Sequence, residues 1–534
     1  MAGKEFNLLH EPWIIVMKPD GQTEEVSMLD AFRHAHKWRA LAGELPTQDV
    51  AVLRLLLAVL HAVFARYDAN GNHAPLDSPG AALKRWSSLW ERGEFPHEII
   101  AEYLAHFEER FWLFHPTQPF YQVSNLTEAT LYTAAKLNGE LSESSNKIRL
   151  FSKRTGERKD QLDFAESARW LIYVNAFDDT SAKPKEKGLS SPGAGWLGKL
   201  GLITAVGDNF FQTLLLNLVM LRDGADELWG VEQPIWEWDV RRSERTAITM
   251  PDNPSALLTL QSRRLLLKRQ AKSVVGFALL GGDFFARENA FAEQMTIWRA
   301  PGKTKGEVPE YSPRRHDASR QLWRDFSSLI AQREGGRRPG VVNWLARLKG
   351  EGLISQKHIR FETAAVKYGD KDFFVDDVFS DSIALNTALL TDLRNYWVER
   401  IADELELTEK LVQKFGELAQ KITIASGDTG SNGARQAAKE QAYFQLDRPF
   451  RIWLEAINPE IDDIDEQCGK WWTAAQQIIR DLGRELVEQA GPKSFCGRTL
   501  REGASVHLYT APEAFNRFLQ YISSREMLKG GKQI

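Results

Sequence analysis

The feature that most constrains the fold is a series of four amphipathic stretches in the last third of the chain. They cover residues 393–422, 438–457, 468–486 and 514–522, and within each one apolar residues recur at helical spacing. That spacing places them on one face of an α-helix. Pro449 lies inside the second stretch, and we expect it to kink or divide that helix. Four such helices joined by modest connections predict an antiparallel four-helix bundle over residues 381–534.

The preceding part of the chain, residues 1–380, has a different pattern. A short hairpin is expected over residues 6–26, where a Pro-Asp-Gly turn separates two strand-like runs. Helices are expected over residues 49–67, 80–92 and 96–106. From about residue 116 to 360, short strand-like runs alternate with long polar connections, which are usually functional or disordered. The sequence therefore predicts an α+β protein with a mixed N-terminal domain that carries long loops.

Composition excludes several classes of protein. The formal net charge of −4 argues against a histone-like polycation, so any contact with nucleic acid must be local. Cys468 and Cys496 are the only cysteines, which rules out a disulfide framework and a cysteine-rich zinc site within the chain. The longest apolar run, residues 52–65, is interrupted by Arg54 and His61 and is too short to span a bilayer. We expect a cytoplasmic protein that does not contact a membrane.

The most basic segment is residues 145–160, with six Lys or Arg against two acidic residues. Phe151 lies in its middle, next to Lys153 and Arg154. Lys and Arg bind phosphate polymers, and an aromatic ring among them can stack on a base or fill a pocket in a partner. A solvated surface loop is the alternative. Two further basic stretches, residues 241–272 and 299–338, could contact phosphates. The alternative for the first is a strand with paired charges, and the alternative for the second is a surface helix.

Two motifs raise the hypothesis of an enzyme. Residues 193–198 match the glycine pattern of a dinucleotide-binding loop, but no strand precedes them and no helix clearly follows. A flexible glycine loop that allows close approach of a backbone fits better. Asp376, Asp377 and Asp381 could belong to a metal-dependent nuclease, although a solvated helix start fits them better. We predict no catalytic residue, no cofactor and no metal site; a scaffold that contacts only protein is a third possibility.

Several ordered stretches resemble the CasA family, the large subunit of the type I-E CRISPR surveillance complex Cascade. The resemblance covers essentially the whole chain, and its matching stretches are residues 7–14, 119–122, 193–201, 260–264 and 316–324. It implies a non-enzymatic subunit that lies near the 5′ handle of the guide RNA, beside the other Cascade subunits. Such a subunit checks double-stranded target DNA for the protospacer-adjacent motif, aids strand opening and helps to recruit a helicase–nuclease. In this family the motif is read mostly in the minor groove, where bases are poorly distinguished.

The resemblance also assigns roles to single residues. Phe151 is similar to the aromatic residue that docks the subunit at the guide-handle end, with Lys153 and Arg154 available to phosphates in the loop beside it. Gly193 and Gly195 resemble a glycine loop that lies against the DNA backbone. Gln294 stands about where the family often has a lysine that points into the minor groove.

Residues 368–373 resemble the family hairpin that recognises the motif and wedges the duplex apart. The usual family pattern is closer to Tyr-Gly-Asn-Asn-Gln-Ala, whereas this chain has Asp370, Lys371, Asp372 and Phe373 after Tyr-Gly. An aspartate facing DNA would be repelled, and Phe373 could insert as an apolar wedge. Either the register is shifted by a residue or the chain recognises a different motif.

Overall fold

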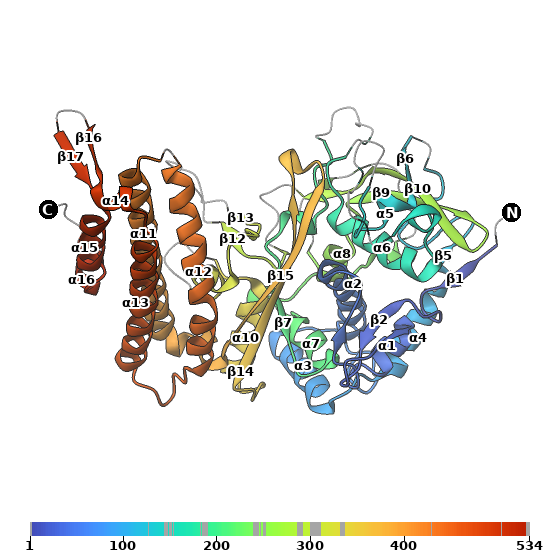
Figure 1. The fold of residues 1–534 in the computed structure, drawn as a ribbon. Helices are drawn as coiled ribbons and strands as arrows, with labels where there is room; N and C mark the ends of the chain where they lie inside the picture. Colours follow the sequence, from blue (N-terminus) through green and yellow to red (C-terminus); the bar gives the residue numbers. More distant parts are fainter. Residues whose placement is uncertain are drawn as a thin grey trace, which may run out of the picture. The chain divides into compact units, whose positions relative to one another are not determined.

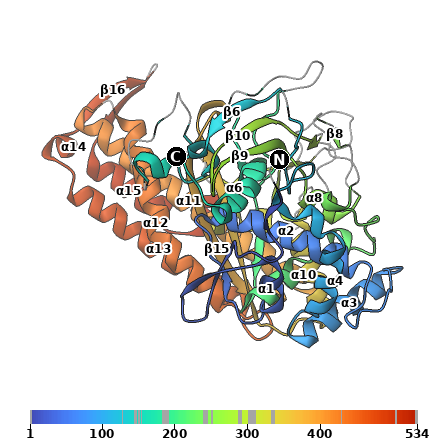
Figure 2. The same ribbon diagram turned by 90° about the vertical axis from the view of Figure 1, so that its right-hand side faces the viewer.

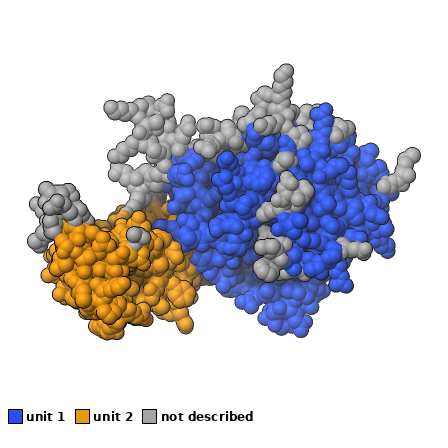
Figure 3. Space-filling model, turned by 45° about the horizontal axis from the view of Figure 1, so that its top comes forward, with its two compact units in different colours: residues 1–320, 334–355, 359–382 blue, residues 321–333, 356–358, 383–534 orange. Residues whose placement is uncertain are grey.

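The structure is a computed structural model, and it describes all residues except 1–2, 127, 144–147, 149–151, 153, 182, 184–190, 239–244, 246, 249–251, 286–291, 300–310, 332–336, 429, 503–504 and 530–534. Helices alternate with several small sheets, which confirms the α+β class (Figure 1). The chain forms two compact units (Figure 3). The first comprises residues 1–320, 334–355 and 359–382, and the second comprises residues 321–333, 356–358 and 383–534. Residues 321–333 and 356–358 thus belong to the second unit, although the sequence prediction placed them in the N-terminal domain.

The centre of the first unit is helix α2 (Pro46–Phe64), which is apolar on nearly all sides. Such a helix has to be enclosed by other elements. It packs against α4 (His97–His106), α6 (Phe164–Phe177), α7 (Phe210–Asn217) and α8 (Pro254–Leu258), as Figures 1 and 2 show for α2 and α6. Within the described residues it is the one helix long and apolar enough to cross a membrane, and 94% of that window is buried.

Small sheets surround these helices. The strands of the first unit pair as β1 (Glu5–Asn7) with β5 (Trp112–Phe114), β3 (Thr23–Val26) with β2 (Ile14–Met17) and β4 (Ala40–Leu41), and β6 (Thr130–Thr133) with β10 (Ser273–Gly281) and β9 (Arg263–Gln270). Two-stranded pairs join β8 (Ala247–Ile248) to β11 (Phe284–Phe285) and β12 (Trp298–Arg299) to β13 (Ser312–Pro313). A further sheet has the order β15 (Val375–Asn386), β14 (His358–Tyr368), β7 (Thr204–Val206). The remaining helices of this unit are α1 (Met28–Arg33), α3 (Pro79–Arg92), α5 (Ala134–Leu137) and α10 (Gly340–Gly350).

The elements predicted near the N-terminus are confirmed. Strands β2 and β3 form the expected hairpin, with Gly21 at φ 85° in its turn, and α2, α3 and α4 match the three expected helices. The prediction of a helix start around Asp376, Asp377 and Asp381 is wrong, because all three residues lie on strand β15. Pairing with β14 in the sheet overrides the weak helical preference of this acidic segment.

The second unit is built on three long helices, α11 (Asn395–Ser426), α12 (Ser431–Ala456) and α13 (Ile464–Glu488), which lie side by side (Figure 1). The shorter α15 (Ala511–Tyr521) packs on α11 and α13. The unit also contains α9 (Phe326–Leu329), α14 (Pro492–Cys496), α16 (Arg525–Lys529) and the hairpin of β16 (Arg498–Glu502) and β17 (Ser505–Tyr509). Helix α12 continues through Pro449, so of the two expected effects of this proline, a kink or a division, the division does not occur. Phe450 and Leu446 beside the proline are fully buried, and their packing stabilises the turns around it.

Candidate nucleic-acid interface

Three distant segments meet at the carboxyl end of helix α6. They are the glycine loop (residues 193–198), the tip of the β14–β15 hairpin (residues 368–373) and the start of strand β9. The other end of α6 is fixed by a capping box, in which Asp163 and Glu166 each accept a hydrogen bond from the other's backbone N–H. Helix α6 therefore provides a fixed base for loops that are separated by up to about 190 residues of sequence.

The glycine loop is held against α6 through its backbone. Gly195 N–H donates to the carbonyl of Asp178 over 2.8 Å, and Gly193 O accepts a 2.7 Å bond from the Arg263 guanidinium. A β-carbon at Gly195 would lie 2.3 Å from the carbonyl oxygen of Ala176, so only glycine fits this approach. The structure thus gives Gly195 a packing role, and Gly193, with φ 66°, needs glycine for its conformation.

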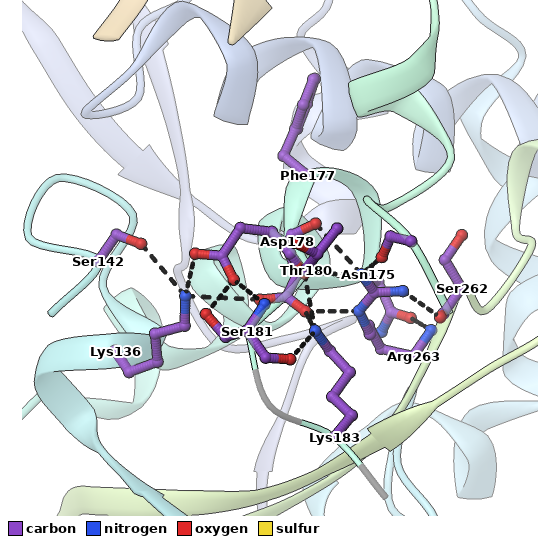
Figure 4. Close-up of polar contacts among 12 residues, drawn as sticks. Lys136, Ser142, Asn175, Phe177, Asp178, Thr180, Ser181, Lys183, Ser262 and Arg263 are labelled. Carbon is purple, nitrogen blue, oxygen red and sulfur yellow. Dashed lines mark hydrogen bonds and ion pairs between the residues drawn. The ribbon is translucent and has the colours of Figure 1, made fainter. Parts of the chain in front are cut away.

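A buried group of charged side chains lies beneath the glycine loop; we call it the charge cluster, and it consists of Lys136, Asp178, Asp179, Lys183 and Arg263 (Figure 4). Asp178 Oδ2 lies 2.5 Å from Arg263 Nε and 2.8 Å from Lys183 Nζ, and Asp179 Oδ2 lies 2.7 Å from Lys136 Nζ. All five side chains are at most 3% exposed.

The charge cluster contains three cations and two carboxylates, so it keeps one positive charge in excess. Burial alone would raise the pKa of Asp178, but Lys183, Arg263 and Lys136 outweigh burial and hold that pKa below its ordinary value. Burial lowers the pKa of Lys183 to about 8. The excess charge lies directly under backbone that could approach an anion.

The hairpin tip is attached to the same end of α6. Tyr368 donates its hydroxyl proton to the carbonyl of Phe177 over 2.7 Å. The backbone N–H and hydroxyl of Thr180 donate to the carbonyls of Asp372 and Lys371 at 2.9 Å. Both tip residues have positive φ values, 53° for Lys371 and 57° for Asp372, so these bonds stabilise an uncommon conformation.

The side chains of the tip are arranged by charge. The Asp372 carboxylate forms two bonds with the Arg315 guanidinium, at 2.7 and 2.8 Å, and that guanidinium also lies over the Tyr368 ring. Lys371 is exposed, and Phe373 retains 49% of its accessible surface. The tip therefore presents the Lys371 cation, the Phe373 ring and the Asp370 carboxylate to solvent, while Asp372 is neutralised by a neighbour.

The other residues predicted for the interface divide into three groups. Phe151 and Lys153 lie outside the described residues. Arg154 forms an ion pair with Glu166 at the start of α6 and stays partly exposed. Gln294 is 6% exposed, and its side-chain oxygen accepts a 2.9 Å bond from the backbone of Asp223, so its amide is not presented to a DNA base in this structure.

Of the two alternatives for the basic strand, the structure favours paired charges. Arg263 and Arg264 are buried, and they pair with Asp178 and Asp283. The second basic stretch is described only in part. Within that part, Arg315, Arg324 and Arg337 pair with carboxylates of other segments, and the expected surface helix is reduced to the buried turn around residues 322–329.

The enzyme hypotheses gain no support from the geometry. A single 3-10 turn, Leu197–Lys199, follows the first glycines, whereas a dinucleotide site needs a full helix there. Asp376 and Asp377 are neighbours on β15 and point to opposite faces of the sheet, and Asp376 forms an ion pair with Lys367. Within the part of the chain that is described, no group of three His, Cys, Asp or Glu side chains could hold a metal ion.

Sequence reasoning missed the partners that position the site. Lys136, Asp178 and Asp179 carry no motif, and Arg315 is one of many arginines in a basic stretch. Lys136 and Asp179 are 43 residues apart, and Asp178 and Arg263 are 85 apart. Lys199 and Arg263 do lie inside stretches that the resemblance singled out, residues 193–201 and 260–264.

Comparison with known proteins identifies the class. The fold matches a chain of a CRISPR RNA-guided surveillance complex with a TM-score of 0.72 at 18% identity, over 98% of this chain and all of that one. The chain belongs to the CRISPR-associated Cse1 family, because the family model for CRISPR-associated protein Cse1 matches residues 7–482. It is a Cse1/CasA subunit of the type I-E CRISPR Cascade surveillance complex, as the sequence resemblance indicated.

Individual relatives agree with this assignment. The curated CasA/Cse1 protein of Thermus thermophilus is 29% identical over 427 residues, which are 79% of this chain and 78% of that protein. The crystal structure of Thermobifida fusca Cse1 has a TM-score of 0.83 and 30% identity, with 98% of each chain covered. Cse1 from Acidimicrobium ferrooxidans has a TM-score of 0.78 and 26% identity, covering 98% of this chain and 99% of that one.

Proposed function

We propose that this subunit recognises the protospacer-adjacent motif in duplex DNA and helps to open the adjacent base pairs, without cutting the DNA. In this account the glycine loop and the hairpin tip form one contact surface for the duplex. The protein recognises only the short motif, and pairing with the guide RNA reads the remaining sequence. Family membership supports the assembly into Cascade, and the geometry at the end of α6 supports the contact surface.

The observation that carries the proposal is the state of the hairpin tip. A free aspartate at position 372 would repel phosphates, but Arg315 neutralises it with two bonds. Lys371 is left exposed to attract the DNA backbone, and the exposed ring of Phe373 is of the kind that unstacks base steps when it inserts from the minor groove. Although Asp370 is also exposed, the departure from the family pattern leaves a cation and an apolar ring at the tip that could contact DNA.

The test replaces the Phe373 ring, the proposed wedge, and leaves the other residues of the hairpin tip unchanged. In the assembled complex, Phe373→Ala should slow or abolish unpairing of the base pair next to the motif, measured with 2-aminopurine fluorescence, while initial duplex binding is retained. Val231→Ala is the control, since Val231 is an 83% exposed apolar residue of the same unit outside the site. Equal unpairing by Phe373→Ala and the wild-type protein would contradict the wedge.

The basic segment around Phe151 has a separate proposed role. By resemblance to the family, Phe151 docks the subunit at the 5′ handle of the guide RNA, with Lys153 and Arg154 beside it. Phe151→Ala should reduce co-purification of the subunit with the other Cascade subunits and leave the melting temperature of the free subunit unchanged. Normal occupancy in the complex would contradict the docking role.

We also propose that the subunit has no catalytic activity and helps a separate helicase–nuclease to join after target binding. Incubation of the pure chain with duplex DNA and Mg²⁺ or Mn²⁺ should give no cleavage. Cleavage that is lost in Asp376→Asn would instead support the nuclease hypothesis. A gel shift with short duplexes, alone and in the complex, separates the DNA-binding role from a scaffold that contacts only protein.

A further inference from the structure

Lys199 is a cation that directly follows the glycine loop, and it has no counter-ion among the residues that the structure describes. It ends the 3-10 turn of the glycine loop, where its backbone N–H donates to the carbonyl of Trp196. Its ammonium group lies beside Gly193, because a β-carbon at that glycine would be 3.5 Å from Nζ. Within the described part of the chain, Nζ forms no hydrogen bond or ion pair, although the residue is only partly exposed.

The surroundings of Lys199 are mostly positive. The charged groups that act on it are the guanidinium groups of Arg263, Arg315 and Arg245 and the carboxylate of Asp372. Asp372 is already bonded twice to Arg315, and Arg263 to Asp178. Burial, followed by the three arginines, lowers the pKa of Lys199 to about 8. Keeping an unpaired cation there is unfavourable for the free subunit, as is typical of groups retained for binding.

Three properties identify the missing anion. The anion must reach Nζ past Gly193, which has no side chain to obstruct it. It must carry negative charge that suits a surface on which the charge cluster adds one further positive charge. It must also lie beside the hairpin tip, since the Tyr368 hydroxyl would be 2.1 Å from a β-carbon at Gly198 in the same loop. A phosphodiester of a DNA strand laid across the glycine loop meets all three conditions.

We propose that Lys199 is a phosphate-binding residue that forms an ion pair with one backbone phosphate of the target duplex, next to Gly193. This inference rests on the proposed function and adds to it a specific contact that does not depend on base sequence. The lysine fixes the position of the duplex relative to the hairpin tip, because phosphate contacts set the register of a protein on DNA.

The test compares Lys199→Gln, Lys199→Arg and the control Lys84→Gln, which removes an exposed lysine of α3, in the assembled complex. Binding of a motif-bearing duplex is measured between 50 and 200 mM salt. For Lys199→Gln we expect the slope of log affinity against log salt concentration to become shallower by about 0.9. The loss of affinity between 50 and 200 mM salt is then about threefold smaller than for the wild-type complex. Lys199→Arg should keep the wild-type slope, and Lys84→Gln should not change it.

A second measurement separates binding from folding. Replacing single phosphates by neutral methylphosphonates should weaken binding of the wild-type complex at one position near the motif, and Lys199→Gln should be insensitive at that same position. The melting temperature of the free Lys199→Gln subunit should stay constant or rise, because an unpaired, partly buried cation is removed.

The outcomes are distinct. An unchanged slope for Lys199→Gln, with or without a lower melting temperature, overturns the role of Lys199 while leaving the proposed function intact. The role of Lys199 is also overturned if Lys199→Gln lowers the salt slope but its binding is still weakened by a methylphosphonate at every position that weakens binding of the wild-type complex. If the wild-type complex shows no preference for motif-bearing duplexes, the proposed function itself fails.

Discussion

Two regions of this protein, the core of the second unit and the loops at the end of α6 in the first, are stabilised in different ways. The second unit has a core of packed aromatic rings, in which the contacting pairs among Trp323, Phe450, Trp453 and Trp471 have ring centroids 4.6 to 5.4 Å apart. The Trp471 indole N–H donates to the Thr408 hydroxyl at 2.9 Å, a neutral bond inside that core. In the first unit, the loops at the end of α6 depend instead on buried ion pairs between distant segments (Figure 4).

This difference indicates a division of roles. Ring packing and amphipathic helices stabilise a unit without leaving charge unbalanced. Buried ion pairs are a weak source of stability, since desolvation offsets most of their attraction. Their use beneath the glycine loop is better explained by what they do for the surface, because they link α5, the segment after α6 and β9 and leave a positive excess next to the proposed DNA site.

The largest expected effect comes from breaking the charge cluster. Asp178→Asn removes the carboxylate shared by Arg263, Lys183 and Lys136, and should cost about 3–5 kcal/mol of stability in the first unit. Hydrogen exchange of peptides from α6 and β9 measures this loss. The control Asp376→Asn removes an exposed partner of Lys367 and should have a much smaller effect, because solvent screens this pair. Equal effects of the two variants would contradict the importance of the buried cluster.

A second carboxylate of the first unit, Asp49, is partly buried, and the attraction of Arg169 compensates it only weakly. Burial raises the pKa of Asp49 to about 7, although the Gly43 N–H donates to it. The folded protein therefore binds more protons than the unfolded chain between pH 4 and 7, and stability falls as the pH rises through this window. Asp49→Asn should stabilise the protein at pH 8 relative to pH 5 by about 2–3 kcal/mol, as urea denaturation at the two pH values would show. An unchanged pH profile would contradict the assignment.

A smaller effect is expected in the helical unit. Thr408→Val keeps the shape of the side chain but leaves the Trp471 N–H without its acceptor, which should cost about 1–2 kcal/mol. The loss should appear in hydrogen exchange of α11 and α13 and not in that of α6. Destabilisation as large as that of Asp178→Asn would remove the contrast between the units.

The smallest effect on stability is expected at the hairpin tip. Phe373→Ala should change the free energy of unfolding by less than about 0.5 kcal/mol, because the ring is half exposed. A large loss, measured by urea denaturation, would show that Phe373 packs within the subunit and is not available to DNA.

The contrast between the helical core and the loops at the end of α6 also determines which parts of the fold and of the site the sequence could predict. The long helices of the second unit and the helices near the N-terminus follow local periodicity, so α2, α3, α4 and α11 were expected from the residues alone. Strand β15 was not, because its acidic residues carry no strand signal and β14 supplies the pairing. The glycine pattern predicted the glycine loop, whereas its contact with DNA and the role of the hairpin were expected only from the resemblance. That both are anchored on α6 is visible only in the fold. No local pattern links Lys136 or Arg263 to Asp178, since tertiary contacts select these partners.

The central claim is that the hairpin tip touches target DNA, and site-specific crosslinking tests it most directly. A photoreactive p-benzoylphenylalanine in place of Phe373, in the complex assembled with guide RNA, should crosslink to the bases that flank the motif of a bound duplex. The same residue in place of Val231 should give no DNA crosslink. Crosslinks from position 373 exclusively to protein subunits would contradict the account.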